Sequence, residues 1–234
     1  MNTQAPEPNG PKAVDGRHRV EVHSVFPTIQ GEGPFAGCPA VFVRLAGCNL
    51  QCPACDTEYT GTRISMSEVE VRMAIEDVTP KSFVGLPLVV ITGGEPFRQD
   101  ISVLVKDLLF NDYDVQIETN GTLYQELPWM HLNLTVVCSP KTGKLNASLA
   151  PHIKYLKYVL KAGQVDPKDG LPISSMLSSS AIARPPHDRA GIFVQALDEK
   201  DEELNRQNLK AAIQSSLLFG HRLCIQTHKE IGLP

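Results

Sequence analysis

The sequence lacks several features that would assign it to a large class of proteins. It has no apolar run long enough to span a bilayer, which argues against a membrane protein. It has no excess of positive charge, because the formal net charge is −4, so binding to nucleic acid or to an anionic membrane is not expected. No internal repeat is visible. What remains is an ordinary globular balance, with 42% hydrophobic and 21% charged residues in a chain of 234.

The first residues also lack the apolar centre of a signal peptide. Residues 1–18 are instead rich in Pro, Gly, Asn and Asp, a composition that does not pack into a core. We therefore predict a flexible leader over residues 1–18, a single domain over residues 19–234 and a cytoplasmic protein.

Strand-like and helix-like segments alternate over much of the chain. Strands are predicted at residues 19–26, 40–46, 88–92, 115–119, 134–138, 155–160, 192–197 and 221–227. Helices are predicted from a capping box at Ser67 and Glu70 to about residue 78, at residues 100–110, and at residues 200–219 before Gly220. This alternation predicts an α/β fold with a mostly parallel sheet, and the surplus of strands predicts an incomplete outer layer of helices.

Polar or glycine-rich turns follow several of these strands, namely AGCNLQC, TGGEP, ETNG, CSPKTG and QALDE. In parallel α/β proteins, ligands bind at the carboxyl edge of the strands. The chemistry of the protein is therefore expected on one face.

Three cysteines stand within eight positions in the stretch CNLQCPACDT. A structural zinc site usually has four ligands, often as two cysteine pairs, but no second pair and no nearby histidine exists here. A four-iron cubane held by three thiolates leaves one iron open to a substrate or cofactor. The alternative is a non-catalytic zinc or iron–sulfur binding module, such as one that acts on RNA. The other three cysteines stand alone and are predicted to be small buried apolar residues.

Two further features have chemical implications. Arg44 lies inside the apolar strand AVFVRLA, where an unpaired charge would be costly, so it needs an anionic partner. That partner is either a substrate carboxylate, which an arginine can bind through two hydrogen bonds, or a structural salt bridge. Gly93 and Gly94 follow a buried strand, where glycine lets the backbone approach a ligand closely.

The CxxxCxxC spacing and the sequence TGGEP together resemble the radical S-adenosylmethionine enzymes, in which three thiolates hold a 4Fe-4S cluster. Longer stretches narrow the likeness. Residues 26–59, VVITGGEP, IETNGT, CSPK and the terminal QTHKEIGLP closely resemble the 7-carboxy-7-deazaguanine synthases. This resemblance runs from Val22 to the last residue and is weakest over residues 163–190. The enzymes that place a glycyl radical on a partner protein share the short core and the three cysteines, and they are the alternative.

The resemblance implies a fold and a reaction. The fold would be a partial, incomplete radical SAM barrel with a reduced set of outer helices. The enzyme would convert 6-carboxy-5,6,7,8-tetrahydropterin to 7-carboxy-7-deazaguanine and ammonia, a lyase step in 7-deazapurine and queuosine biosynthesis. Its cofactors would be the 4Fe-4S cluster, S-adenosyl-L-methionine, which is regenerated, and Mg²⁺. A flavodoxin-type electron donor and a homodimer are implied, with no nucleic acid or membrane partner.

The resemblance also implies roles for matching positions. Cys48, Cys52 and Cys55 would bind the cluster and, with Arg44 and Glu32, form the catalytic set. Thr57 would bind Mg²⁺, and an ordinary turn hydroxyl is the alternative. The substrate contacts would be Ile29, Gln30, Gly31, Glu32, Arg44, Thr92, His228 and Pro234. The contacts to S-adenosylmethionine would be Ala54, Cys55, Asp56, Gly93, Gly94, Glu95, Glu118, Ser139, Pro140, Lys141, Gln195, Ala196, Leu197 and Asp198. Relatives often have proline where this chain has Ala196.

Overall fold

The computed structural model describes residues 4–7, 10, 18–53, 55, 57–175, 177 and 180–233. One nine-stranded sheet forms its centre, in the order β3-β1-β2-β4-β5-β6-β7-β8-β9. The strands are β1 (Val20–Ile29), β2 (Pro39–Leu45), β3 (Ile64–Met66), β4 (Leu88–Gly93), β5 (Val115–Thr119), β6 (Leu134–Cys138), β7 (Tyr155–Leu160), β8 (Gly191–Ala196) and β9 (Arg222–Cys224). The α-helices are α1 (Glu68–Val78), α2 (Ser102–Phe110), α3 (Glu202–Phe219) and α4 (Thr227–Glu230), and the 3-10 turns are η1 (Gly33–Phe35), η2 (Pro96–Arg98) and η3 (Ala150–His152).

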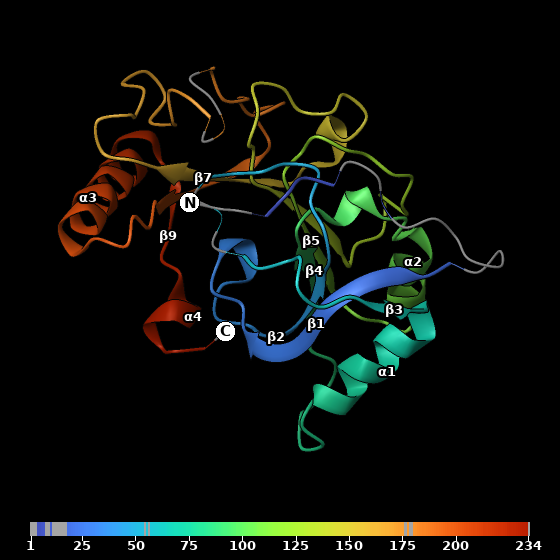
Figure 1. The fold of residues 1–234 in the computed structure, drawn as a ribbon. Helices are drawn as coiled ribbons and strands as arrows, with labels where there is room; N and C mark the ends of the chain where they lie inside the picture. The colour runs from blue at the N-terminus through green and yellow to red at the C-terminus, as the bar shows by residue number, and fades with distance from the viewer. Residues whose placement is uncertain are drawn as a thin grey trace.

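The sheet is mostly parallel and open. At one end β1 runs antiparallel to both β2 and β3. From β2 to β9 all neighbouring strands are parallel. Because β3 and β9 remain as two edges, the curved sheet does not close into a full barrel (Figure 1). The predicted α/β class and incomplete barrel are confirmed.

Local sequence explains the main elements. The Ser67 hydroxyl accepts from the backbone N–H of Glu70 at 3.3 Å, and the Glu70 carboxylate accepts from the backbone N–H of Ser67 at 2.7 Å. This is the predicted capping box, and α1 begins there. At the other end of the chain, α3 begins after Asp201, which caps it, and ends at Gly220, whose φ of +75° suits glycine. The first four residues of β4 are all buried, as expected for a strand covered on both faces.

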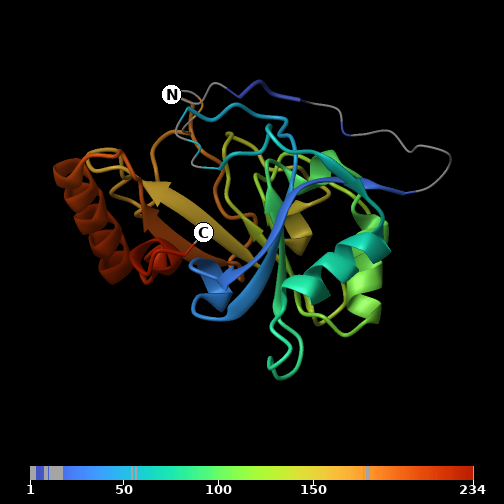
Figure 2. The same cartoon turned by 60° about the horizontal axis from the view of Figure 1, so that its bottom comes forward.

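The helices cover the sheet unevenly. α1 and α2 pack against each other near β1 and β5, while α3 packs on β8 and β9 at the opposite end (Figure 2). Among the described residues, the links from β5 to β8 contain only the short turn η3 and no α-helix. The predicted shortage of outer helices therefore falls in the middle of the sheet.

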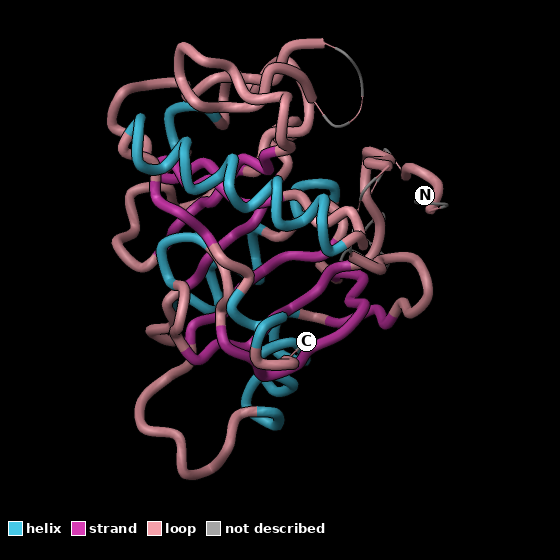
Figure 3. The backbone as a smooth tube through the Cα atoms, turned by 90° about the vertical axis from the view of Figure 1, so that its left-hand side faces the viewer, coloured by secondary structure: helices cyan, strands magenta, loops and turns pink. Residues whose placement is uncertain are grey.

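The C-terminal segment differs from the prediction. The predicted strand over residues 221–227 is wrong beyond residue 224, because β9 ends there and Thr227 begins α4. Thr227 N–H donates to the Gly31 carbonyl at 3.4 Å, and His228 packs so tightly that a Cβ on Gly31 would lie 1.8 Å from its Nδ1. After β9 the chain therefore leaves β8, and α4 packs beside the end of β1 (Figure 3). The short strand β3, which pairs with β1, is also absent from the prediction.

Two observations concern the predicted organisation. No helix in the described part of the chain is long and apolar enough to cross a membrane. Within the predicted leader, Gln4 and Glu7 hydrogen-bond to residues 48–59 of the core. The boundary between leader and domain at residue 18 stays a prediction.

Candidate active site

A cavity of about 1120 Å³ opens at the carboxyl edge of the parallel strands. Its wall combines turns that follow several neighbouring strands, as the parallel topology predicts. The predicted site residues that line it are Gln30, Glu32, Arg44, Cys48, Cys52, Cys55, Thr57, Thr92, Gly93, Gly94, Glu118, Ser139, Lys141, Gln195, Ala196, Leu197, Asp198 and His228. Residues far apart in the sequence therefore meet on one surface, while their individual roles stay predictions.

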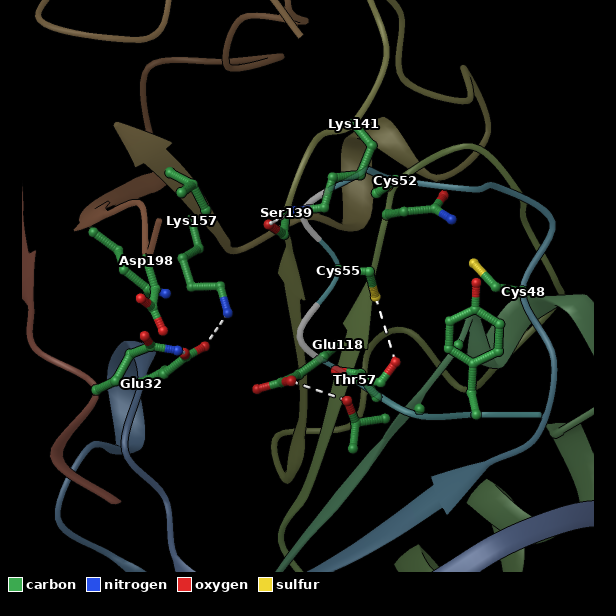
Figure 4. A pocket seen from close by; sticks show the side chains of 18 of the residues that line it. Glu32, Cys48, Cys52, Cys55, Thr57, Glu118, Ser139, Lys141, Lys157 and Asp198 are labelled. Atoms are coloured by element: carbon green, nitrogen blue, oxygen red, sulfur yellow. Dashed lines mark hydrogen bonds and ion pairs between the residues drawn. The ribbon is translucent and has the colours of Figure 1, made fainter. Parts of the chain in front are cut away.

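The three cysteines lie on one loop of this wall. A hydrogen bond of 2.9 Å from Gly47 N to Tyr59 O closes the base of residues 47–59, which we term the cysteine loop. Within it, Cys55 Sγ donates to the Thr57 carbonyl at 3.6 Å (Figure 4). Among the described residues, no group of three or more His, Cys, Asp or Glu side chains is gathered closely enough to hold a metal ion. The thiols share a cavity without being drawn together.

The chemistry of these thiols nevertheless fits a metal cluster. Burial raises the pKa of Cys48 to about 12, and nearby charges that include Cys52 and Cys55 add to this effect. Burial also raises the pKa of Cys52, with Lys141 opposing the shift. Thiolates in such a place repel one another unless a cation lies between them. Iron would supply that charge, so Cys48, Cys52 and Cys55 fit a 4Fe-4S cluster and would hold it at this cavity.

Two glycines hold the end of β4 against the cysteine loop. A Cβ on Gly93 would lie 2.1 Å from the Leu45 carbonyl oxygen, and one on Gly94 would lie 2.0 Å from the Gly47 carbonyl oxygen. The backbone N–H of Gly94 donates to Leu45 O at 3.2 Å, and that of Glu95 donates to Gly47 O at 3.1 Å. Only glycine permits this approach, which sets the position of the first cysteine.

Glu95 is fully buried and is not among the cavity-lining residues that the structure describes. Its carboxylate accepts hydrogen bonds from Thr119 Oγ1 at 2.7 Å, Asn120 N at 2.7 Å and Phe97 N at 3.1 Å. Burial raises the pKa of Glu95 to about 7, although these hydrogen bonds act to lower it. Glu95 therefore joins the ends of β4 and β5, and its contact with S-adenosylmethionine stays a prediction.

A second carboxylate, that of Glu118, lines the cavity (Figure 4). It accepts hydrogen bonds from Thr92 Oγ1 at 3.0 Å, Gln30 Nε2 at 3.1 Å and Gln116 Nε2 at 2.9 Å. These neutral donors come from the loop after β1, from β4 and from β5 itself, and they fix the carboxylate in place. The arrangement presents hydroxyl, amide and carboxylate groups to one ligand edge.

The predicted site omits Lys157, whose ammonium forms an ion pair with Glu32 at the cavity wall (Figure 4). The other oxygen of Glu32 accepts from Gln226 Nε2 at 2.7 Å. Burial acts to lower the pKa of Lys157, but the charges of Glu32 and Glu118 outweigh it and raise this pKa. The available signal was a basic residue inside the apolar strand YLKYVL, the same signal that singled out Arg44.

Arg44 reaches the cavity from β2. Its guanidinium lies over the Phe26 ring, with 5.1 Å between the guanidinium carbon and the ring centroid. Such stacking orients the planar group, whose edge has the geometry for a two-point contact with a carboxylate.

Some predicted residues do not join this surface. Ile29, Gly31 and Pro140 are described but are not among the cavity-lining residues. Ala54, Asp56 and Pro234 lie outside the described residues, so the structure neither supports nor contradicts their predicted contacts.

An open, mostly parallel sheet that carries a CxxxCxxC loop at its carboxyl edge defines the class of radical S-adenosylmethionine enzymes. No family model matches the chain. It is 43% identical over 228 residues to the 7-carboxy-7-deazaguanine synthase of Rhodospirillum rubrum, with 94% of each chain covered. It is 40% identical over 221 residues to that of Rickettsia prowazekii, with 92% of this chain and 89% of the other covered.

The chain belongs to the 7-carboxy-7-deazaguanine synthase family, whose members are radical SAM lyases of queuosine biosynthesis. The crystal structure of QueE from Escherichia coli has the same fold, with a TM-score of 0.67 at 24% identity over 88% of this chain and 92% of that one. The predicted enzyme class is confirmed, in preference to glycyl-radical activation.

Proposed function

We propose that this chain converts 6-carboxy-5,6,7,8-tetrahydropterin to 7-carboxy-7-deazaguanine with release of ammonia. The observation that carries the proposal is its 43% identity, over nearly the whole chain, to a 7-carboxy-7-deazaguanine synthase. Substrate and product differ by one ammonia, so the conversion consumes no electrons overall. The absence of a net electron demand agrees with the expectation that S-adenosylmethionine is regenerated after each turnover.

When bound, the reduced 4Fe-4S cluster and S-adenosylmethionine would supply a 5′-deoxyadenosyl radical that removes a hydrogen atom from the substrate and later returns it. The residues of the chain bind and orient the reactants. Cys48, Cys52 and Cys55 hold the cluster at the cavity wall, and Gly93 and Gly94, which line the same cavity, contact the methionine end of the cofactor through their backbone. Support comes from the three thiols and two glycines on one wall of the cavity.

Arg44 is the proposed partner of the substrate carboxylate, and its place on the cavity wall above Phe26 supports this role. Thr92 and Gln30 are proposed to bind the donor and acceptor edge of the pterin, and Glu118, which accepts a hydrogen bond from each of them, is the proposed contact to S-adenosylmethionine beside it. The carboxylate of Pro234 is proposed to reach the substrate, in line with the position of His228 on the same wall.

Further parts of the proposal concern partners. Thr57 lines the cavity and is proposed to bind Mg²⁺, since a hard cation prefers oxygen ligands. A flavodoxin-type electron donor, a homodimer and a cytoplasmic location follow from the family resemblance. The proposed domain is a single radical SAM core over residues 19–234.

The test is an anaerobic incubation of the reconstituted protein with the carboxypterin, S-adenosylmethionine, Mg²⁺ and a reductant. Mass spectrometry should find the ring-contracted product and one ammonia for each substrate consumed, while S-adenosylmethionine is not depleted. A protein that carries an intact, reducible cluster but forms no ring-contracted product would refute the proposed reaction. A colourless protein loaded with zinc would refute the cluster itself.

A further inference from the structure

The N-terminal segment at residues 4–7 lies along the cysteine loop, although the two are more than forty positions apart in the sequence. The segment runs beside the loop that precedes β3 in two views of the fold (Figure 1, Figure 2). Gln4 also lines the cavity, together with the three cysteines. Residues that the composition predicted to be unattached therefore contact the part of the chain that carries the cluster ligands.

Gln4 makes two hydrogen bonds with the last part of the cysteine loop. Its side-chain Nε2 donates to the Thr57 carbonyl at 2.9 Å, and its Oε1 accepts from the backbone N–H of Tyr59 at 2.9 Å. One amide thus uses both its donor and its acceptor to hold the backbone on either side of Glu58, as a neighbouring strand would. This arrangement requires an amide, because a purely acidic or purely basic side chain offers only one of the two functions.

Glu7 makes contacts at the first part of the same loop. Its backbone N–H donates to the Cys48 carbonyl at 2.6 Å, and its carboxylate forms an ion pair with Arg63. The same carboxylate lies 3.5 Å from the guanidinium of Arg98, whose side chain is 1% exposed. Arg98 in turn donates to the Ala46 carbonyl at 2.9 Å, next to the base of the loop. Glu7 is therefore anchored to a buried cation that also binds the chain just before the first cysteine.

The loop has limited means of holding its own shape. Between its ends, which Gly47 and Tyr59 join, the internal bonds of the described residues are few and mostly long; among them, Cys55 N donates to Cys52 O at 3.2 Å, Tyr59 Oη to Leu50 O at 3.5 Å and Cys55 Sγ to Thr57 O at 3.6 Å. No helix or strand is formed in the described part of the loop. External contacts at Cys48, Thr57 and Tyr59 therefore contribute substantially to its order.

We propose that Gln4 and Glu7 are positioning residues, which hold the cysteine loop in the conformation that presents Cys48, Cys52, Cys55 and Thr57 to the cavity. They act through the loop and not by contact with the reacting atoms. The inference rests on the proposed function in one respect only, namely that the loop binds an iron–sulfur cluster.

The experiment compares Gln4→Ala and Gln4→Glu with the wild type and with a matched control. Gln207→Ala removes a glutamine that makes a single exposed hydrogen bond to Glu203 on α3. Each full-length protein is reconstituted anaerobically, and iron and sulfide per chain are measured. The loss of cluster absorbance is then followed after exposure to air and, separately, to an iron chelator. Circular dichroism of the metal-free proteins checks that all of them are folded.

Loss of the cluster should be about thirty times faster in Gln4→Ala than in the wild type, which corresponds to about 2 kcal/mol for the two hydrogen bonds lost. Gln4→Glu has the same shape but would direct an acceptor at the Thr57 carbonyl, so it should lose its cluster at least as fast as Gln4→Ala. Gln207→Ala should match the wild type. Wild-type cluster loss in Gln4→Ala would overturn the proposal. A wild-type rate of cluster loss in Gln4→Glu would also overturn the proposal, since the shape of the side chain and not its hydrogen bonds would then support the loop.

The role of Glu7 is tested in parallel with Glu7→Ala, whose control is Glu203→Ala. Glu203 forms an ion pair with Arg206 on α3 that is more exposed than the pairs of Glu7, so its removal deletes an acidic side chain and an ion pair far from the loop. Faster cluster loss in Glu7→Ala alone supports the proposal, and equal rates in both variants contradict it. These readouts do not involve the carboxypterin. A wild-type enzyme that keeps its cluster but forms no product would refute the proposed function and leave this test valid.

Discussion

The close approach of β4 to the cysteine loop makes Gly94→Ala a sharp test of the site. The added Cβ would lie 2.0 Å from the Gly47 carbonyl oxygen and 2.9 Å from Cys48 Cβ, whereas real Cβ contacts are essentially never below 3.0 Å. Neither neighbour can turn away by a side-chain rotation, so the loop base must move by about 1.4 Å to lengthen the 2.0 Å approach to the 3.4 Å of an ordinary contact. The backbone conformation of Gly94 is itself ordinary, because its φ lies outside the left-handed region. The effect is therefore steric.

The expected loss of folding stability follows from the contacts that the added Cβ would disturb. Overpacking of a well-packed site costs about 1–3 kcal/mol, and weakening the hydrogen bond from Glu95 N to Gly47 O adds about 1 kcal/mol. A total near 3 kcal/mol should lower the Tm of a chain of this size by about 6–12 °C. Displacement of Cys48 should also reduce the iron bound after reconstitution.

The assay is thermal unfolding of the metal-free protein together with iron and sulfide analysis after anaerobic reconstitution. Gly85→Ala is the matched control, because Gly85 has a φ of +84° but no atom within 4 Å of the added Cβ. It should lose about 1–2 kcal/mol of stability from backbone strain and keep normal iron content. A Gly94→Ala protein with wild-type Tm and iron would refute the packing argument. Equal iron loss in Gly85→Ala would show that the loss of iron comes from general destabilisation and not from the clash with the cysteine loop.

The remaining predictions address binding and pH. Arg44→Ala should impair turnover of the carboxypterin while cluster absorbance stays intact; normal kinetics would make Arg44 purely structural. Extra residues after Pro234 should weaken substrate binding in titrations, and unchanged affinity would remove the terminal carboxylate from the site. Because the folded pKa of Glu95, about 7, exceeds its ordinary 4.5, its contribution to stability is complete below pH 4.5 and is lost as pH rises through 7. Denaturant unfolding of the metal-free protein should show this decline, and Glu95→Gln should lack it; identical pH slopes would contradict the assignment.

Much of the fold is predictable from local pattern. The strands at residues 115–119, 134–138 and 155–160 match β5, β6 and β7 because alternation, β-branched residues and bounding turns are properties of short segments. The helix at Ser67 is predictable for the same reason, since a capping box is complete within four residues. Prediction fails at β9, where a contact from Thr227 to Gly31 overrides the strand pattern of residues 221–227.

Some residues of the candidate site are also predictable from local sequence, and others are not. The cysteine spacing, the paired glycines and the charge of Arg44 within an apolar strand are legible in the sequence, because each is an unusual residue choice in its own local context. Lys157 is harder to identify, since its meaning depends on Glu32, which lies 125 positions away, and on Gln226, which lies 194 positions from Glu32. Gln4 and Glu7 fall in the predicted leader because their neighbours in sequence are polar and rich in proline.

By itself, the sequence determined the candidate ligands, the turns that carry them and the α/β order that brings strand ends to one edge. These follow from residue chemistry and from periodicity, both of which act over a few positions. Only the tertiary structure decided which distant groups pair across the cavity, where the tail crosses to β1, and that the N-terminal segment holds the cysteine loop. Such pairings depend on how the whole curved sheet brings remote segments together, and a local pattern contains no record of that path.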